Sequence, residues 1–188
     1  KGSTCAFLRG AIEAAGLLAH VYSSPHLVRF NERIRVAGQL IDDTSLSALL
    51  SEVLDHAEGL EASFFEVTTA ATFLAFHRYP ADACVIEVGL GGRFDATNVL
   101  DGQAACAIAT LGIDHEAFLL VPEAGVPADP MCRIAFEKAG IARAGVDAFF
   151  DQRLDVISRI ETMGKPSVAT LFGYCLGGGL ELPLGCTF

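Results

Sequence analysis

A short apolar run, a cluster of glycines and a cluster of polar residues follow one another between residues 83 and 98. Residues 83–88 are rich in β-branched side chains, which predicts a strand buried on both faces of a parallel sheet. Gly89-Leu-Gly-Gly92 ends this strand, and residues 93–98 then supply a cation, a carboxylate, a hydroxyl and an amide. Because ligands of open α/β sheets bind outside the carboxyl ends of the strands, we expect Arg93 and Asp95 to line a substrate site. A glycine-rich turn with solvated polar residues is the alternative.

The first four residues form a second group with chemical potential, Lys1-Gly2-Ser3-Thr4. They run into residues 5–16, whose apolar side chains recur at the spacing of one helical face. A lysine ammonium neutralises phosphate charge, a hydroxyl can hold Mg²⁺, and the start of a helix presents free N–H groups. This group therefore indicates phosphate binding, with an ordinary capped helix start as the alternative.

Two further polar residues stand at the expected ends of secondary structure. Glu66 lies on the first turn of a helix predicted over 64–79, where a carboxylate also stabilises the helix dipole. His115 lies just past an apolar run, 104–111, that is typical of a strand. A histidine in such a position can be a ligand or can be structural.

The elements that position these residues alternate along the chain. A strand is expected at 17–24, a helix from Asp42 or Asp43 to about residue 54, and a short helix at 134–142. This alternation predicts an α/β fold with a doubly wound, mainly parallel sheet. Residues 149–188 predict a C-terminal helix–strand–helix appendage with its strand at 167–172.

Composition limits the classes of function. The 188 residues are 52% hydrophobic and 19% charged, which suits one domain or slightly more with a sizeable core. A net charge of −10 disfavours nucleic acid and anionic membranes as partners. The six cysteines form no CxxC pair, which is typical of thiols in a reducing compartment. Because the sequence shows no membrane-length apolar run and no signal peptide, we expect a cytoplasmic protein.

Residues 1–146 resemble the folylpolyglutamate synthase/dihydrofolate synthase family of Mur-type ligases. The motifs of the resemblance occur in the family's order: Lys1-Gly-Ser-Thr4, Tyr22–Ile34, Phe65-Glu-Val67, Glu87–Val99, Gly112-Ile-Asp-His115 and Glu137-Lys-Ala-Gly-Ile141. The resemblance implies a partial P-loop NTPase-like ATP-binding domain, truncated at its N-terminus. The glycines that precede the family's lysine, the strand behind them and the family's glutamate-binding domain have no counterpart here.

The resemblance also implies an activity and its residues. A folate or dihydropteroate carboxylate would take the γ-phosphate of ATP, and the amine of L-glutamate would displace phosphate from the acyl phosphate to form an amide. By family position, Lys1, Gly2, Ser3 and Thr4 would bind ATP, and Ser24, Glu66 and His115 would hold Mg²⁺. Lys138, which matches a lysine carried as a carbamate, and His115 would be catalytic, whereas Pro25 and His26 would lie at the pteridine site.

Residues 147–188 resemble a fragment of the enoyl-CoA hydratase/isomerase (crotonase) family. The matching stretches are 150–160, Lys165-Pro166 and 173–182. The resemblance implies that the N–H of Gly178 stabilises a thioester oxyanion and that Glu181 is a catalytic glutamate. The family's other oxyanion donor and second glutamate fall outside the match, which favours an inactive glycine-rich turn. Two alternatives to a ligase therefore remain, a crotonase-type acyl-CoA enzyme fragment and a non-catalytic chimeric α/β module.

Overall fold

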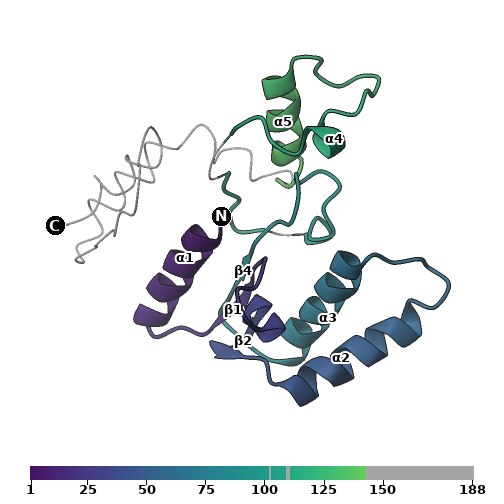
Figure 1. Ribbon diagram of the computed structural model, residues 1–188. Helices are drawn as coiled ribbons and strands as arrows, with labels where there is room; N and C mark the ends of the chain where they lie inside the picture. The colour runs from purple at the N-terminus through teal and green to yellow at the C-terminus, as the bar shows by residue number, and fades with distance from the viewer. Residues whose placement is uncertain (102, 109–110, 143–188) are drawn as a thin grey trace. The chain divides into compact units, whose positions relative to one another are not determined.

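The computed structural model describes residues 1–101, 103–108 and 111–142. It divides the chain into two compact units, Lys1–Val99 and Leu100 onward, which are described separately (Figure 1). The predicted domain boundary at 146/147, the appendage, Gly178 and Glu181 all lie outside the described residues. In the part that the structure describes, no helix is long and apolar enough to cross a membrane.

The first unit is built on a four-stranded sheet in the order β3-β2-β1-β4. Its strands are β1 (Ala19–Tyr22), β2 (Ile34–Val36), β3 (Gln39–Leu40) and β4 (Ala83–Ile86). Strands β1 and β4 run parallel, with Ala19 opposite Ala83 and Tyr22 opposite Ile86. Strand β2 is antiparallel to both of its neighbours. The predicted α/β class is confirmed, although the sheet is mixed and only the β1–β4 pairing is parallel among the described strands.

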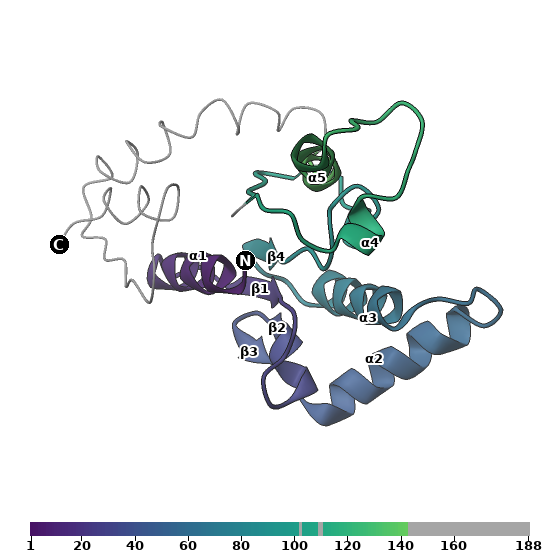
Figure 2. The same ribbon diagram turned by 45° about the horizontal axis from the view of Figure 1, so that its top comes forward.

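Helices cover both faces of this sheet because successive residues of a strand point to opposite sides. Figures 1 and 2 show α1 (Gly2–Ala14) on one side of the strands and the pair α2 (Asp43–His56) and α3 (Phe64–Arg78) on the other. Val21 packs with Cys5 of α1, whereas the next residue, Tyr22, joins the core formed with α2 and α3. The Tyr22 hydroxyl also lies 3.1 Å from the Thr69 hydroxyl of α3.

Local signals explain where the helices of this unit begin. The Asp42 carboxylate accepts the Ser45 N–H at 2.8 Å, so the expected cap of α2 is confirmed. At the start of α3, Ser63 and Glu66 bind each other's backbone N–H groups in a capping box. A 3₁₀ helix, η1 (Phe30–Arg33), precedes β2.

Two expectations were wrong and one element was missed. Residues 103–108 form no strand, although 104–111 was expected to be one. Strand β4 is not fully buried: the Cys84 side chain is exposed, although Ile86 on the same face packs against the core, and β1 is its only strand neighbour among the described residues. The β2–β3 hairpin was not predicted, because its turn residues Ala37 and Gly38 both take positive φ (47° and 82°) without the usual Asn-Gly sequence.

The buried side chain of His20 connects β1 to the β2–β3 turn and to the end of α3. His20 is 2% exposed, and its ring stacks on Phe76 of α3 at 4.4 Å between centroids. Its Nδ1 accepts the Ala37 N–H at 3.0 Å, so Nε2 carries the proton that is donated to the Tyr79 carbonyl, also at 3.0 Å. One side chain therefore links the sheet, the β2–β3 turn and the end of α3.

We predict that His20→Ala lowers the free energy of unfolding by about 3 kcal/mol, because it leaves a buried N–H and a buried carbonyl unpaired and opens a cavity. Urea unfolding followed by circular dichroism measures the change. His77→Ala, at an exposed position of the same helix end, is the matched control and should stay close to the parent protein. Equal stability of the two variants would contradict the assignment.

The second unit contains α4 (Glu116–Leu119) and α5 (Pro130–Ala139). Helix α5 starts earlier than the predicted residue 134 because Asp129 caps it and Pro130 stands at its first position. Arg133 is buried in α5, where it binds Glu137 at 2.8 Å and Glu123 of the preceding loop at 3.0 Å. This ion-paired group fixes the proline-rich loop against the helix.

Candidate functional site

The parallel pairing of β1 and β4 places the residues that follow both strands next to each other. Ser24 comes two residues after β1, and Glu87 comes directly after β4. The Ser24 N–H donates to Glu87 Oε2 at 3.2 Å, and the Glu87 N–H donates to the Tyr22 carbonyl at 2.8 Å. Glu87 is only 5% exposed. A hydroxyl-bearing residue and a buried carboxylate therefore meet at the carboxyl edge of the sheet.

The start of α1 lies at the same edge. The Lys1 ammonium donates to the carbonyls of Val88 and Gly89 at 2.9 and 3.0 Å. A Cβ on Gly2 would lie 3.7 Å from Glu87 Oε2, so the first turn of the helix faces that carboxylate. Burial and the nearby Glu87 carboxylate raise the pKa of the Cys5 thiol one turn later. The structure thus brings the predicted phosphate-binding residues Lys1 and Gly2 to Ser24 and Glu87, while Ser3 and Thr4 are exposed on the same turn.

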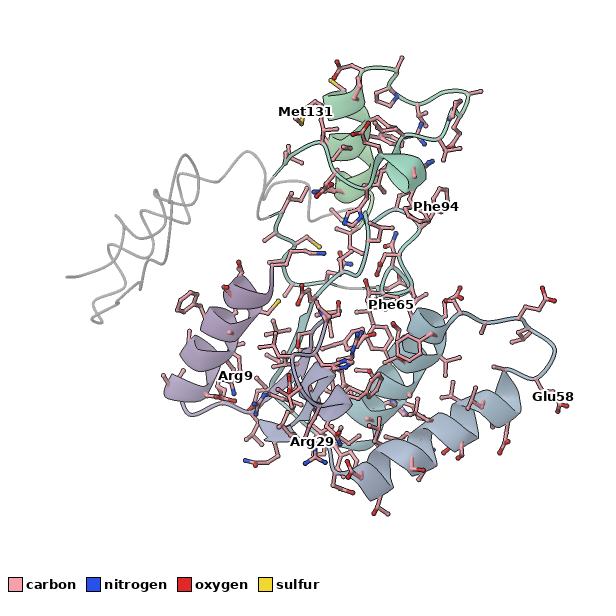
Figure 3. All side chains as sticks on the ribbon, viewed as in Figure 1. Arg9, Arg29, Glu58, Phe65, Phe94 and Met131 are labelled. Carbon is pink, nitrogen blue, oxygen red and sulfur yellow. The ribbon has the colours of Figure 1, made fainter. Side chains whose placement is uncertain are left out.

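The glycine-rich loop after β4 is closed by Asp95. Its Oδ2 accepts the Leu90 N–H at 2.9 Å, and its Oδ1 accepts the N–H and the hydroxyl of Thr97 at 3.0 and 2.6 Å. Asp95 is 9% exposed, so this carboxylate shapes the loop from inside. Arg93 lies 4.2 Å above the ring of Phe94, which is exposed (Figure 3). Substrate contacts by Arg93 and Asp95 stay a prediction.

Gly89 permits a close approach between this loop and α3. A Cβ built on Gly89 would lie 2.5 Å from Cζ of Phe65, which Figure 3 labels at the start of α3, and 3.0 Å from Asp95 Oδ2. No larger residue fits there unless the ring and the carboxylate both move.

We predict that Gly89→Ala lowers the free energy of unfolding by about 1–3 kcal/mol through this overpacking. The midpoint of urea unfolding reports the effect. Gly10→Ala is the control, because a Cβ at Gly10 meets nothing within 4 Å in the middle of α1. That change should stabilise the helix by up to about 1 kcal/mol. A stable Gly89→Ala protein would show that the loop and α3 are less tightly packed than described.

The contacts of Glu66 are those of a helix-start carboxylate, the alternative role that the sequence offered for it. Its Oε2 accepts the Ser63 N–H at 2.8 Å and the Ser63 hydroxyl at 2.5 Å. The hydrogen bond from the Ser63 hydroxyl, and to a smaller extent the one from the Ser63 N–H, lower the pKa of the exposed Glu66 carboxyl. Metal binding by Glu66 stays a prediction. Sequence reasoning assigned no function to Glu87, although the rule that ligands lie beyond the carboxyl ends of strands points to it.

Two further predicted site residues, His115 and Lys138, lie in the second unit. His115 precedes α4 in a left-handed backbone conformation, φ 51° and ψ 37°. Lys138 lies in the last turn of α5, with its Nζ 3.8 Å from Oδ1 of Asp114, the neighbour of His115. The structure therefore brings Lys138 to the Gly112–His115 motif. Across the described residues, no group of three or more His, Cys, Asp or Glu side chains could hold a metal ion by itself.

No family model matches the chain. It is 40% identical over 143 residues to the dihydrofolate synthase/folylpolyglutamate synthase of Haemophilus influenzae, which covers 76% of this chain and 30% of that protein. It is 38% identical over 157 residues to mitochondrial folylpolyglutamate synthase of Bos taurus, covering 79% of this chain and 26% of that protein. About three quarters of the chain belongs to the folylpolyglutamate synthase/dihydrofolate synthase family.

Solved structures of this family superpose on the chain. E. coli FolC in complex with DHPP and ADP matches with a TM-score of 0.67 and 36% identity, over 76% of this chain and 32% of that chain. A point mutant of L. casei FPGS matches with a TM-score of 0.66 and 30% identity, over 78% and 35% of the two chains. The predicted membership in the Mur ligase family is confirmed. The comparisons lend no support to a crotonase relationship.

The chain spans about a quarter to a third of the length of the curated folylpolyglutamate and dihydrofolate synthases that it matches. The family membership therefore applies to a segment. The two clusters described above, Lys1–Ser24–Glu87 and Asp114–Lys138, both lie on motifs of this family.

Proposed function

We propose that this chain is the nucleotide-binding part of an ATP-dependent ligase that adds L-glutamate to a folate or dihydropteroate carboxylate through an acyl phosphate. The observation that supports it is the meeting of Lys1, Ser24 and Glu87 beyond two parallel strands. The relatives support the proposal because they are named as folylpolyglutamate and dihydrofolate synthases. A related structure from Yersinia pestis contains AMPPNP and a Mn ion. The proposed partners are small molecules: ATP, the pteridine acid and L-glutamate.

Transfer of a phosphoryl group requires compensation of its negative charge. The Lys1 ammonium lies against two backbone carbonyls, which a phosphate oxygen can replace as its partner. The first N–H groups of α1 are the natural donors to the same anion. Lys1 and the start of α1 would therefore hold the nucleotide phosphates.

Ser24 and Glu87 fit a magnesium ion chemically. Both offer oxygen atoms, and Mg²⁺ is commonly held by one or two carboxylates together with substrate phosphates and water. When bound there, Mg²⁺ would neutralise charge on the phosphoryl group. In this proposal Glu87 is the carboxylate ligand beside Ser24, and the roles of His115 and Lys138 rest on their positions in the family motifs.

We predict that Mg-ATP raises the melting temperature of the chain and that Glu87→Gln abolishes the magnesium-dependent part of the rise, because an amide is a much weaker ligand for Mg²⁺ than a carboxylate. Glu66→Gln is the matched control: it should lower the melting temperature slightly by weakening the capping box and leave the response to Mg-ATP intact. Differential scanning fluorimetry with ATP, with and without Mg²⁺, measures both. The opposite pattern would assign the metal to Glu66.

We further predict that Lys138→Ala removes L-glutamate-dependent release of ADP, because a carbamate on this lysine would provide an oxygen ligand for a metal ion. A coupled assay of ADP in the presence of folate or dihydropteroate measures the loss. The response of the melting temperature to ATP without Mg²⁺ should stay as in the parent chain. Full glutamate-dependent turnover in this variant would contradict the assignment.

We infer a reducing compartment for the protein. The described cysteines Cys5, Cys84, Cys106 and Cys132 are all free thiols. The free thiols and the bacterial relatives support the cytoplasm as this compartment. Other relatives are enzymes named mitochondrial.

A further inference from the structure

A buried ion pair lies in α5, the helix that carries Lys138. Arg133 and Glu137 are only 6% and 4% exposed, and Nε of Arg133 donates to Oε1 of Glu137 at 2.8 Å. Nη2 of the same guanidinium donates to Oε2 of Glu123 at 3.0 Å. Glu123 belongs to the loop that joins α4 to α5. One arginine therefore binds both its own helix and the loop that leads into that helix.

Stability alone does not favour the burial of these charges. The free energy needed to remove two charged groups from water is about as large as their attraction releases, so apolar side chains of similar size would stabilise the helix as well. The planar guanidinium adds direction, because its Nε–H and Nη2–H point to fixed places in one plane. The ion pair therefore specifies where the loop lies on the helix.

The place of the loop determines the place of α4. Helix α4 packs on α5, and its last residue, Leu119, is buried (Figures 1 and 2). The N–H groups of Phe118 and Leu119 donate to the His115 carbonyl at 2.9 and 3.0 Å. His115 and its neighbour Asp114 are therefore attached to α4. Oδ1 of Asp114 lies 3.8 Å from Nζ of Lys138, so this pair reports how α4 sits on α5.

We propose that Arg133 is a positioning residue that keeps Lys138 beside Asp114 by holding the α4–α5 loop on α5. This inference rests on the proposed function for the catalytic roles of Lys138 and His115. Glu137, which Arg133 binds, directly precedes Lys138 in the same helix. A rotation of α5 that turned Lys138 away from Asp114 would therefore also turn the ion pair away from the loop.

The first test is hydrogen exchange, followed by NMR, on Glu123→Gln. This change removes the charge on the loop and leaves the buried Arg133–Glu137 pair intact, and the Glu123 side chain is 41% exposed, so the chain should still fold. We expect the amides of Phe118 and Leu119 to exchange about tenfold faster, which corresponds to a loss of about 1.4 kcal/mol. The amides of α5 should exchange as in the parent chain.

The second test follows Lys138 itself by acylation with a lysine-reactive ester and peptide mass spectrometry. In Glu123→Gln we expect Lys138 to react about tenfold faster, the same factor as for amide exchange, because its amine leaves Asp114. Lys1 is the internal reference, because it lies in the first unit and its rate should not change.

Two further variants define the cause of the change. Arg133→Lys keeps the positive charge but lacks the planar fork that binds two carboxylates, so it should act like Glu123→Gln in both tests. Glu52→Gln is the matched control. The Glu52 carboxylate accepts two hydrogen bonds from Arg78 at an exposed place in the first unit, and its loss should change neither the α4 amides nor the labelling of Lys138.

The third test is the coupled assay of L-glutamate-dependent ADP release. A displaced Lys138 should lower kcat about tenfold in Glu123→Gln and in Arg133→Lys. The KM for ATP should stay unchanged, because the proposed phosphate-binding residues Lys1, Ser24 and Glu87 lie in the first unit. Glu52→Gln should keep the parent values of both constants.

The outcomes separate the inference from the proposed function. Unchanged labelling of Lys138 in Glu123→Gln would overturn the inference. Loss of protection throughout α5 would overturn it as well, because Arg133 would then stabilise the unit as a whole. Faster labelling with the kcat of the parent chain would show that the reaction does not need Lys138 in this place. Absence of turnover in the parent chain would contradict the proposed function, and the labelling and exchange results, which need no substrate, would then decide the inference.

Discussion

The site depends on the parallel pairing of β1 with β4. With Tyr22 opposite Ile86, the chain leaves both strands at the same edge, and the Glu87 N–H closes the last rung on the Tyr22 carbonyl. Ser24 and Glu87 meet only because of this register. A shift of one residue would turn every side chain of β4 to the opposite face. It would remove Val85 from its packing with Cys5 and Val21 beneath α1.

The contacts of four acidic residues in the described part of the chain distinguish three roles. Asp95 and Glu32 each accept three hydrogen bonds from their own loops, so they determine loop shape. Glu66 starts a helix. Glu87 accepts the Ser24 N–H at the edge of the sheet and lies against a helix start. Among these four residues, Glu87 therefore has the surroundings that suit a cation and a phosphate.

Much of the first unit could be predicted from local patterns. Asp42 or Asp43 and the apolar spacing after them predicted α2, and residues 64–79 predicted α3 within one residue. The strand expected at 17–24 and the β-branched run at 83–88 predicted β1 and β4. The missed elements depend on other parts of the chain. The Ala37-Gly38 turn takes a conformation that its sequence does not favour, because β2 and β3 pair around it. The apolar run at 104–111 had the composition of a strand, yet residues 103–108 are not paired in a sheet.

The order of motifs from Lys1 to Ile141 was enough to recognise the family, because a set of short motifs in one order is far more specific than each alone. Which carboxylate meets Ser24 was a different kind of question. Glu66 and Glu87 both lie in the motifs that carry the resemblance. Their spacing along the sequence does not show which of the two carboxylates is hydrogen-bonded within its own helix and which one reaches Ser24. Only the tertiary structure decided this, because it gives Glu66 to the start of α3 and brings Glu87 to the edge of the sheet through the pairing of two strands more than sixty residues apart in the sequence.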